Sequence, residues 1–81
     1  MQKDFNTAVG NYLKEIRKNK KITLQEASTR CHKSVGWLAD IESGRNRVYF
    51  DDMQKLCKMY NLDMIALFEK FEDKLDKEGG D

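Results

Sequence analysis

The sequence has no proline, a single histidine, two cysteines and no long apolar run. A transmembrane helix needs about 20 consecutive apolar residues, and no stretch of this chain approaches that length, so we expect no membrane span. The N-terminus also lacks the continuous apolar segment of a signal peptide. With no export signal, the sequence predicts a cytoplasmic protein.

Residues for metal binding and catalysis are equally scarce. His32 follows Cys31, but the pair lacks the paired C-x-x-C spacing of a zinc site, and His32 is interpreted as an exposed turn residue. Neither a G-x-S-x-G motif nor a phosphate-cradling glycine loop is present. Cys31 and Cys57 show no partner pattern, so we expect two buried free thiols. The sequence therefore predicts no metal, no cofactor and no enzymatic activity.

Charged residues, in contrast, are plentiful and unevenly distributed. They make up 36% of the 81 residues, with a net charge of +1. Residues 1–47 carry ten lysines and arginines against five acidic residues, whereas residues 48–81 carry five against nine. A chain polarised in this way can turn its basic half toward a polyanion and keep its acidic half away. The same distribution would also arise if both segments were simply solvated. Charge alone does not decide between these two interpretations.

Residues 23–44 predict two short helices joined by a tight turn. Thr23 and Glu26 have the spacing of a capping box, and Ser34 is a second N-cap. Gly44 is expected to end the second helix in the left-handed conformation. Helices of about two turns are marginal alone in water, so both must dock on flanking helices. Their inward positions are expected to be Leu24, Ala27, Cys31, Leu38 and Ile41.

Three longer helices are predicted around this pair. The first covers about Phe5 to Asn19 after an Asp4 N-cap, with Gly10 permitting a close helix contact. Another covers about residues 50–60, and the last covers 64–77 after an Asp63 cap. We expect one all-α domain over residues 1–77, with a helix-turn-helix at 23–44, an extended C-terminal helix at 63–77 and a disordered tail at 78–81.

The helix at 50–60 carries an apolar face and an acidic first turn. Asp51 and Asp52 are interpreted as surface charge that complements the helix dipole. The inner face is expected to consist of Phe50, Met53, Leu56, Cys57 and Tyr60.

The spacing of Ser34, Leu38, Ile41, Glu42 and Gly44 follows the pattern S-x-x-x-I-x-x-I-E-x-G. It resembles the helix-turn-helix of the XRE family of phage and bacterial repressors. The resemblance covers roughly residues 9–68 without a gap, although the family often has proline where this chain has Val48.

This resemblance implies a compact five-helix, repressor-like fold in which residues 34–42 form the recognition helix in the DNA major groove. It also implies a sequence-specific transcriptional regulator of the repressor type that binds double-stranded DNA at an inverted-repeat operator as a homodimer. The expected DNA-facing residues are Gln25, Lys33, Ser34, Val35, Gly36, Trp37, Ala39, Asp40, Arg45, Asn46 and Arg47.

The outward positions of the recognition helix depart from the usual chemistry of base readout. Arg, Lys, Asn and Gln make most bidentate contacts to bases, and none occupies positions 35, 36, 39 or 40. Val35 and Ala39 could touch thymine methyl groups, and Gly36 could let the backbone approach closely. Asp40 could accept a hydrogen bond from cytosine but would also repel phosphates. Phosphate contacts are expected from Lys33, Arg45, Asn46 and Arg47. The family often has a phosphate-contacting glutamine at the position of Leu24, and here the glutamine, Gln25, follows one residue later.

Trp37 stands where the resemblance leads us to expect a small residue. Its indole could pack on the sugar-phosphate backbone, fill a gap beside the preceding helix, or anchor a protein partner, where Trp is enriched. The alternative function is therefore a protein-interaction module that keeps the fold and binds DNA weakly or not at all.

An ion pair and an apolar stripe complete the predictions. Arg17 and Glu42 resemble the family's buried ion pair, which links the first helix to the end of the recognition helix. The sequence itself agrees, since each residue lies at the edge of an apolar stripe and a buried charge needs a partner. Phe68, Phe71 and Leu75 form an apolar stripe on the last helix. An exposed stripe of this kind predicts a homodimer interface; the alternative is that the helix folds back near Phe5.

Overall fold

The computed structural model describes the backbone of residues 2–79 and the side chains of residues 5–73. In that part of the chain the secondary structure is entirely helical, which confirms the predicted all-α class. None of these helices has the length and apolar composition needed to cross a bilayer. The helices are α1 (Gln2–Asn19), α2 (Leu24–Arg30), α3 (Val35–Ser43), α4 (Phe50–Tyr60) and α5 (Met64–Gly79).

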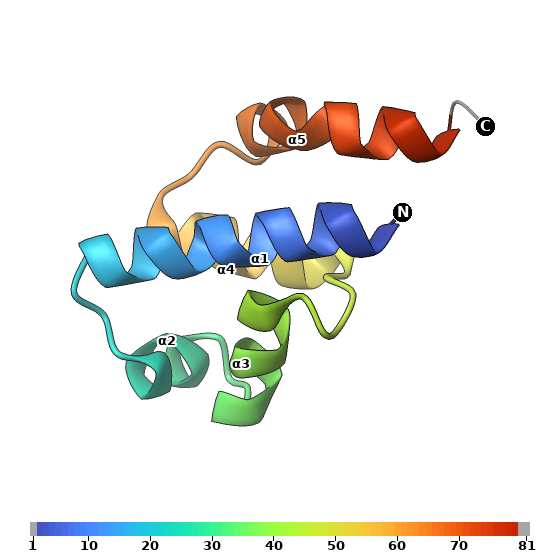
Figure 1. The fold of residues 1–81 in the computed structure, drawn as a ribbon. Coiled ribbons are helices and arrows are strands. Elements are labelled where there is room, and N and C mark those ends of the chain that lie inside the picture. Colours follow the sequence, from blue (N-terminus) through green and yellow to red (C-terminus); the bar gives the residue numbers. More distant parts are fainter. Residues whose placement is uncertain (1, 80–81) are drawn as a thin grey trace.

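The helices lie in three tiers, with α1 in the middle (Figure 1). In this view α4 lies behind α1, the α2–α3 pair lies below them, and α5 lies above. α1 packs against both α3 and α5, and α2 packs against α3. The helix-turn-helix and the C-terminal helix are therefore on opposite sides of α1.

One continuous core joins the helices, as the apolar periodicity predicts. Cys31 and Cys57 are both buried free thiols, which confirms that prediction. Burial raises the pKa of each thiol, because the thiolate would lose hydration. The buried apolar residues are Val9, Leu13, Ala27, Cys31, Leu38, Ile41, Met53, Leu56, Cys57, Tyr60 and Leu67.

The ends of the outer helices differ slightly from the predicted ones. α1 begins at Gln2, so Asp4 lies within the helix and is not its N-cap. α5 continues to Gly79, two residues past the predicted end at 77, while residues 80–81 of the predicted tail lie outside the described residues. Asp63 caps α5 as predicted, since its Oδ1 accepts hydrogen bonds from the backbone N–H of Ile65 and Ala66.

Aromatic side chains attach α5 to α1. The rings of Phe5 and Phe68 are stacked with centroids 6.2 Å apart, and Tyr12 meets Phe71 edge to face at 5.5 Å. Such pairs add about 0.5–1.5 kcal/mol beyond simple burial. Phe68 and Phe71 thus pack within the chain, which is the alternative that the sequence left open beside a dimer. Leu75, the third residue of the predicted dimer stripe, lies outside the described side chains.

Two expectations for α4 are wrong. Phe50, the first residue of α4, is 63% exposed. Asp52 was expected on the surface but is buried, with Oδ1 3.8 Å from Lys33 Nζ. A carboxylate can be buried at this position because the lysine of the α2–α3 turn faces it.

Gly10 permits a close approach between α1 and α3, as the sequence predicts. A Cβ atom placed on Gly10 would collide with the backbone carbonyl oxygen of Ile41 and would lie 3.1 Å from that of Glu42. These obstacles are backbone atoms, which cannot rotate away. The contact therefore sets the distance between α1 and the end of α3.

We expect Gly10→Ala to lower the free energy of unfolding by about 1–3 kcal/mol, the usual cost of overpacking. The matched control is Gly36→Ala, because a Cβ there would have only Ser34 Oγ within 4 Å, at 3.9 Å. In that helix Ala should stabilise by about 0.5–1 kcal/mol relative to Gly. Urea denaturation of both variants measures the two changes, and equal effects would contradict the proposed helix contact.

Candidate nucleic-acid interface

The turn between α2 and α3 is built from local hydrogen bonds. The backbone N–H of Glu26 donates to Thr23 Oγ1 at 3.0 Å, and that of Thr23 donates to Glu26 Oε1 at 2.9 Å, so the predicted capping box is present. Hydrogen bonding to Thr23 lowers the pKa of Glu26. At α3, Ser34 Oγ accepts from the Trp37 N–H at 3.1 Å. These caps fix where each short helix begins.

Positive-φ residues set the direction of the chain at the ends of these helices. His32 has φ of 60° in the turn between α2 and α3, and it is exposed, as predicted. Gly44 adopts φ of 81° as the C-cap of α3, again as predicted. A non-glycine residue with positive φ is uncommon, so the His32 turn is held by its neighbours: the N–H of Lys33 donates to the Ser28 carbonyl at 2.9 Å.

A buried ion pair fastens the end of α3 to α1. Arg17 Nε donates to Glu42 Oε2 at 2.7 Å, and Arg17 Nη2 donates to Oε1 at 3.1 Å. The remaining nitrogen, Nη1, donates to the Ile22 carbonyl at 2.9 Å. The hydrogen bonds to Glu42 raise the pKa of Arg17. One guanidinium group therefore holds α1, the segment before α2, and α3 together.

Tyr60 lies in the electrostatic field of this pair. Its hydroxyl is buried and has no hydrogen-bond partner among the described residues. Burial raises the pKa of Tyr60 to about 12, and the Glu42 carboxylate adds to the effect. The phenol is thus held neutral beside the ion pair.

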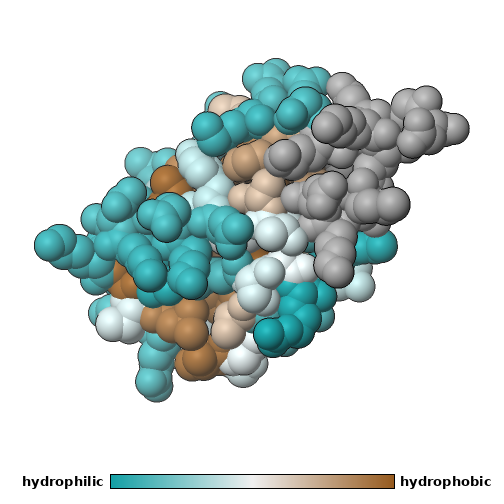
Figure 2. Space-filling view, in the orientation of Figure 1, coloured by the Kyte–Doolittle hydropathy of each residue, from teal (hydrophilic) through white to brown (hydrophobic). Residues whose placement is uncertain are grey.

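The N-terminal end of α3 presents a small apolar surface to solvent. Val35 is 41% exposed, Gly36 is exposed, and Ala39 is partly buried. Figure 2 shows apolar surface at the lower end of the molecule, where α2 and α3 meet the solvent. Of the residues predicted to face DNA, Gln25 and Ser34 are also exposed. No side chain at 35, 36 or 39 can make a polar contact to a base.

Asp40, which was predicted to face DNA, forms hydrogen bonds within the chain. Its Oδ1 lies 2.6 Å from Arg45 Nη1, and its Oδ2 accepts a hydrogen bond from Asn46 Nδ2 at 3.2 Å. Its backbone carbonyl accepts from the N–H groups of both Arg45 and Asn46, at 3.0 and 3.3 Å. The carboxylate is therefore occupied within the chain. Asp40 thus organises the loop after α3.

That loop supplies the exposed cations of the site. Arg45, Asn46 and Arg47 are all exposed and directly follow the Gly44 cap. Lys33 is exposed as well, but its ammonium group lies between two partners, Asp52 Oδ1 at 3.8 Å and the Trp37 ring at 5.7 Å. Lys33 and Arg45 are thus each paired with a carboxylate, and the exposed side chains of Arg45 and Arg47 place two cationic groups in the loop before α4.

Trp37 lies on the α4 side of α3. Its half-buried ring borders a hollow of about 470 Å³ shared with the loop and the start of α4. The hollow is lined by Lys33, Trp37, Ile41, Asn46, Arg47, Tyr49 and Asp52. No α2 residue lines this hollow.

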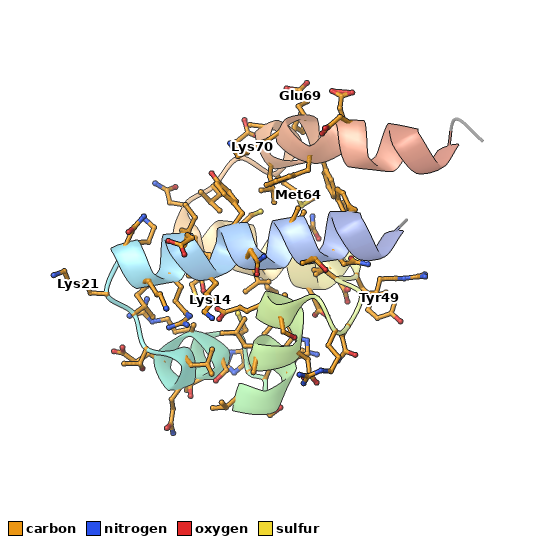
Figure 3. The ribbon with its side chains drawn as sticks, viewed as in Figure 1. Lys14, Lys21, Tyr49, Met64, Glu69 and Lys70 are labelled. Atoms are coloured by element: carbon orange, nitrogen blue, oxygen red, sulfur yellow. The ribbon has the colours of Figure 1, made fainter. Side chains whose placement is uncertain are left out.

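Two aromatic residues that the sequence did not assign to this site are exposed beside it; Tyr49 had no predicted role, and Phe50 was expected in the core. Tyr49 and Phe50 are each 63% exposed and follow the basic loop. Figure 3 shows Tyr49 where the loop meets α4, on the side of α1 away from α5. Adjacent residues of a helix cannot both face the core, so two consecutive aromatic residues at a helix start could have indicated an exposed ring.

The described residues include no group of three or more His, Cys, Asp or Glu side chains that could hold a metal ion. The side chains exposed at this surface offer hydrogen bonding, charge and apolar contact. These are the interactions by which a helix end and a cationic loop can contact a polyanion.

Comparisons with known proteins agree with this geometry. A family model described as a helix-turn-helix domain matches residues 8–69. A crystal structure of the clp gene regulator ClgR from C. glutamicum has 23% sequence identity and a TM-score of 0.76, covering 86% of this chain and 91% of that chain. A second ClgR structure, from Corynebacterium glutamicum, has 21% identity and a TM-score of 0.77, covering 94% and 81%. No curated protein matches the chain.

Because the ion pair positions α3, we expect Glu42→Ala to lower the free energy of unfolding by about 3–5 kcal/mol, since a buried guanidinium loses its partner. The control is Glu69→Ala on the exposed surface of α5, expected to change it by less than about 0.5 kcal/mol. Thermal unfolding followed by circular dichroism compares the variants. A melting temperature unchanged by Glu42→Ala would show that the pair does not hold the helices together.

Proposed function

Because the chain belongs to the helix-turn-helix domain family, we propose that it is a sequence-specific, DNA-binding transcriptional regulator of the repressor type. The observation that carries the proposal is the exposed N-terminal end of α3 beside the exposed cations of residues 45–47. α3 enters the major groove, and the loop contacts the flanking phosphates. Catalysis forms no part of this function.

Base recognition at this site rests on shape and apolar contact. Val35 and Ala39 approach thymine methyl groups, and Gly36 lets the helix backbone come close. With few direct readers, sequence-dependent DNA shape carries a larger share of the specificity. Ser34, Gln25 and Lys33 contribute at the edge of the groove, and the phosphate contacts make binding strongly dependent on salt.

The proposed regulator binds an inverted repeat as a homodimer, with half-sites about one helical turn apart. Phe68 and Phe71 already pack on α1, so less apolar surface of α5 is left for a partner. The exposed Tyr49 and Phe50 lie next to the DNA-facing loop, whereas α5 lies on the opposite side of α1 (Figure 1). A two-fold contact through these two rings keeps both α3 helices near one face of the DNA.

Removal of the loop cations tests the DNA-binding surface. The slope of log K against log salt concentration is negative for a protein that contacts phosphates. We expect Arg45→Gln plus Arg47→Gln to make this slope shallower by about two units. Glutamine is preferred to glutamate because a new carboxylate would face Asp40. Fluorescence anisotropy with a labelled duplex at several salt concentrations measures the slope.

The matched control for this experiment removes two charges elsewhere. Lys58→Gln plus Lys70→Gln changes exposed residues of α4 and α5 and should leave the slope within about half a unit. If both double variants behave alike, the loop does not contact phosphates. The protein-interaction function then gains support, with Val35, Trp37, Tyr49 and Phe50 as the surface to test.

Asp40 should limit the affinity for DNA. Its carboxylate occupies the Arg45 guanidinium and repels phosphates. We expect Asp40→Asn to raise the affinity for duplex DNA by about threefold to tenfold, since one unit charge near a phosphate is worth about 1 kcal/mol in water. Asp63→Asn is the control, because it removes the same charge at the α5 cap and keeps a good capping residue. Weaker binding by Asp40→Asn would show that orienting Arg45 outweighs the repulsion.

A further inference from the structure

A second hollow lies between the end of α2 and the outer face of α4, apart from the proposed DNA-binding surface. Its volume is about 400 Å³, which falls within the range of small-molecule sites. None of its lining residues is among those assigned to DNA contact. The lining residues are Arg30, Cys31, His32, Lys55, Lys58 and Met59.

The lining is cationic, with no acidic residue. Arg30, Lys55 and Lys58 supply three cationic side chains to it. Lys55 and Lys58 are three residues apart, so they lie on one side of α4. The Arg17, Lys33 and Arg45 salt bridges of the described residues involve neither of these two lysines. Like charges gathered in one place repel one another, and a bound anion would relieve that repulsion.

Helix ends explain only part of this arrangement. Arg30 lies in the last turn of α2 and Lys58 in the last turn of α4, where the helix dipole favours a cation. Lys55 lies in the middle of α4 and gains nothing from the dipole. The convergence of all three on one hollow is therefore not a consequence of helix capping.

The base of the hollow is apolar. Cys31 is buried, with 3% of its surface exposed, and Met59 is half-buried. A thiol and a thioether offer weak hydrogen bonding but good contact with hydrocarbon. A small inorganic anion would use only the cationic rim. A ligand that uses both parts has an acidic group at the rim and an apolar body against Met59.

We propose that this hollow, between α2 and α4, binds a small organic monocarboxylate. The carboxylate lies among Arg30, Lys55 and Lys58, and the hydrocarbon part lies over Met59 and Cys31. This binding is independent of the DNA-binding function proposed above, because it uses different residues.

Hexanoate is the probe, and the methyl carbon resonance of Met59, assigned with Met59→Leu, is the reporter. We expect a saturable shift with a dissociation constant of about 1 mM, a typical affinity for a ligand of this size. The neutral analogue 1-hexanol lacks the carboxylate, and inorganic phosphate lacks the hydrocarbon chain. Each should therefore bind about tenfold more weakly.

Charge reversal gives the second arm of the test. Lys55→Glu plus Lys58→Glu should weaken hexanoate binding at least about tenfold. Lys14→Glu plus Lys18→Glu makes the same change in net charge on exposed residues of α1 and should leave the binding unchanged. The proposal is overturned if hexanoate produces no saturable shift, if 1-hexanol or phosphate binds as well as hexanoate, or if the two double variants behave alike. Circular dichroism of both variants confirms that they are folded.

Discussion

The position of α3 depends on the buried contact between Arg17 and Glu42. A charged pair in the core is stable only when both partners are present and fully hydrogen-bonded, and here the guanidinium also binds the Ile22 carbonyl. The three hydrogen bonds tie α1 to the start of the helix-turn-helix and to its end. Gly10 brings the backbones of α1 and α3 together near the same place. The orientation of α3 is thus fixed by its C-terminal half.

The opposite half of α3 is left free for contact with a partner. The Ser34 cap and the exposed Val35 and Gly36 face solvent, while Asp40 bends the following loop back along the helix through Arg45 and Asn46. A rigid helix end beside an oriented cationic loop needs little reorganisation on binding, which favours affinity. Glu69 and Lys70 lie on α5, on the other side of α1 (Figure 3).

Features that depend on a few neighbouring residues could be predicted from the sequence. The capping box at Thr23, the Ser34 cap and the left-handed Gly44 all follow from contacts within four residues, and the family model confirms the predicted helix-turn-helix domain. The Arg17–Glu42 pair spans 25 residues, and it was predicted because the resemblance added to the burial argument.

Features that depend on the path of a loop or on helix docking could not be predicted. Asp40 was expected to face DNA because helical periodicity places it outward; its partners come from the loop that Gly44 redirects. At the start of α4, Phe50 is exposed although it was expected in the core, and Asp52 is buried although it was expected on the surface. Asp52 faces Lys33 of the α2–α3 turn, a contact between residues 19 positions apart that helical periodicity does not reveal. For Phe68, periodicity gives the apolar face but not whether α1 or a second copy covers it.

The measurement that tests the central claim most directly is selection of binding sites from a randomised duplex pool, followed by affinity for the selected site against scrambled DNA. The account predicts a palindromic consensus with half-sites about one helical turn apart, favoured by about 10³-fold or more. It also predicts thymines opposite Val35 and Ala39 in each half-site. Selection that yields no consensus, with weak binding lost at physiological salt, would contradict the account.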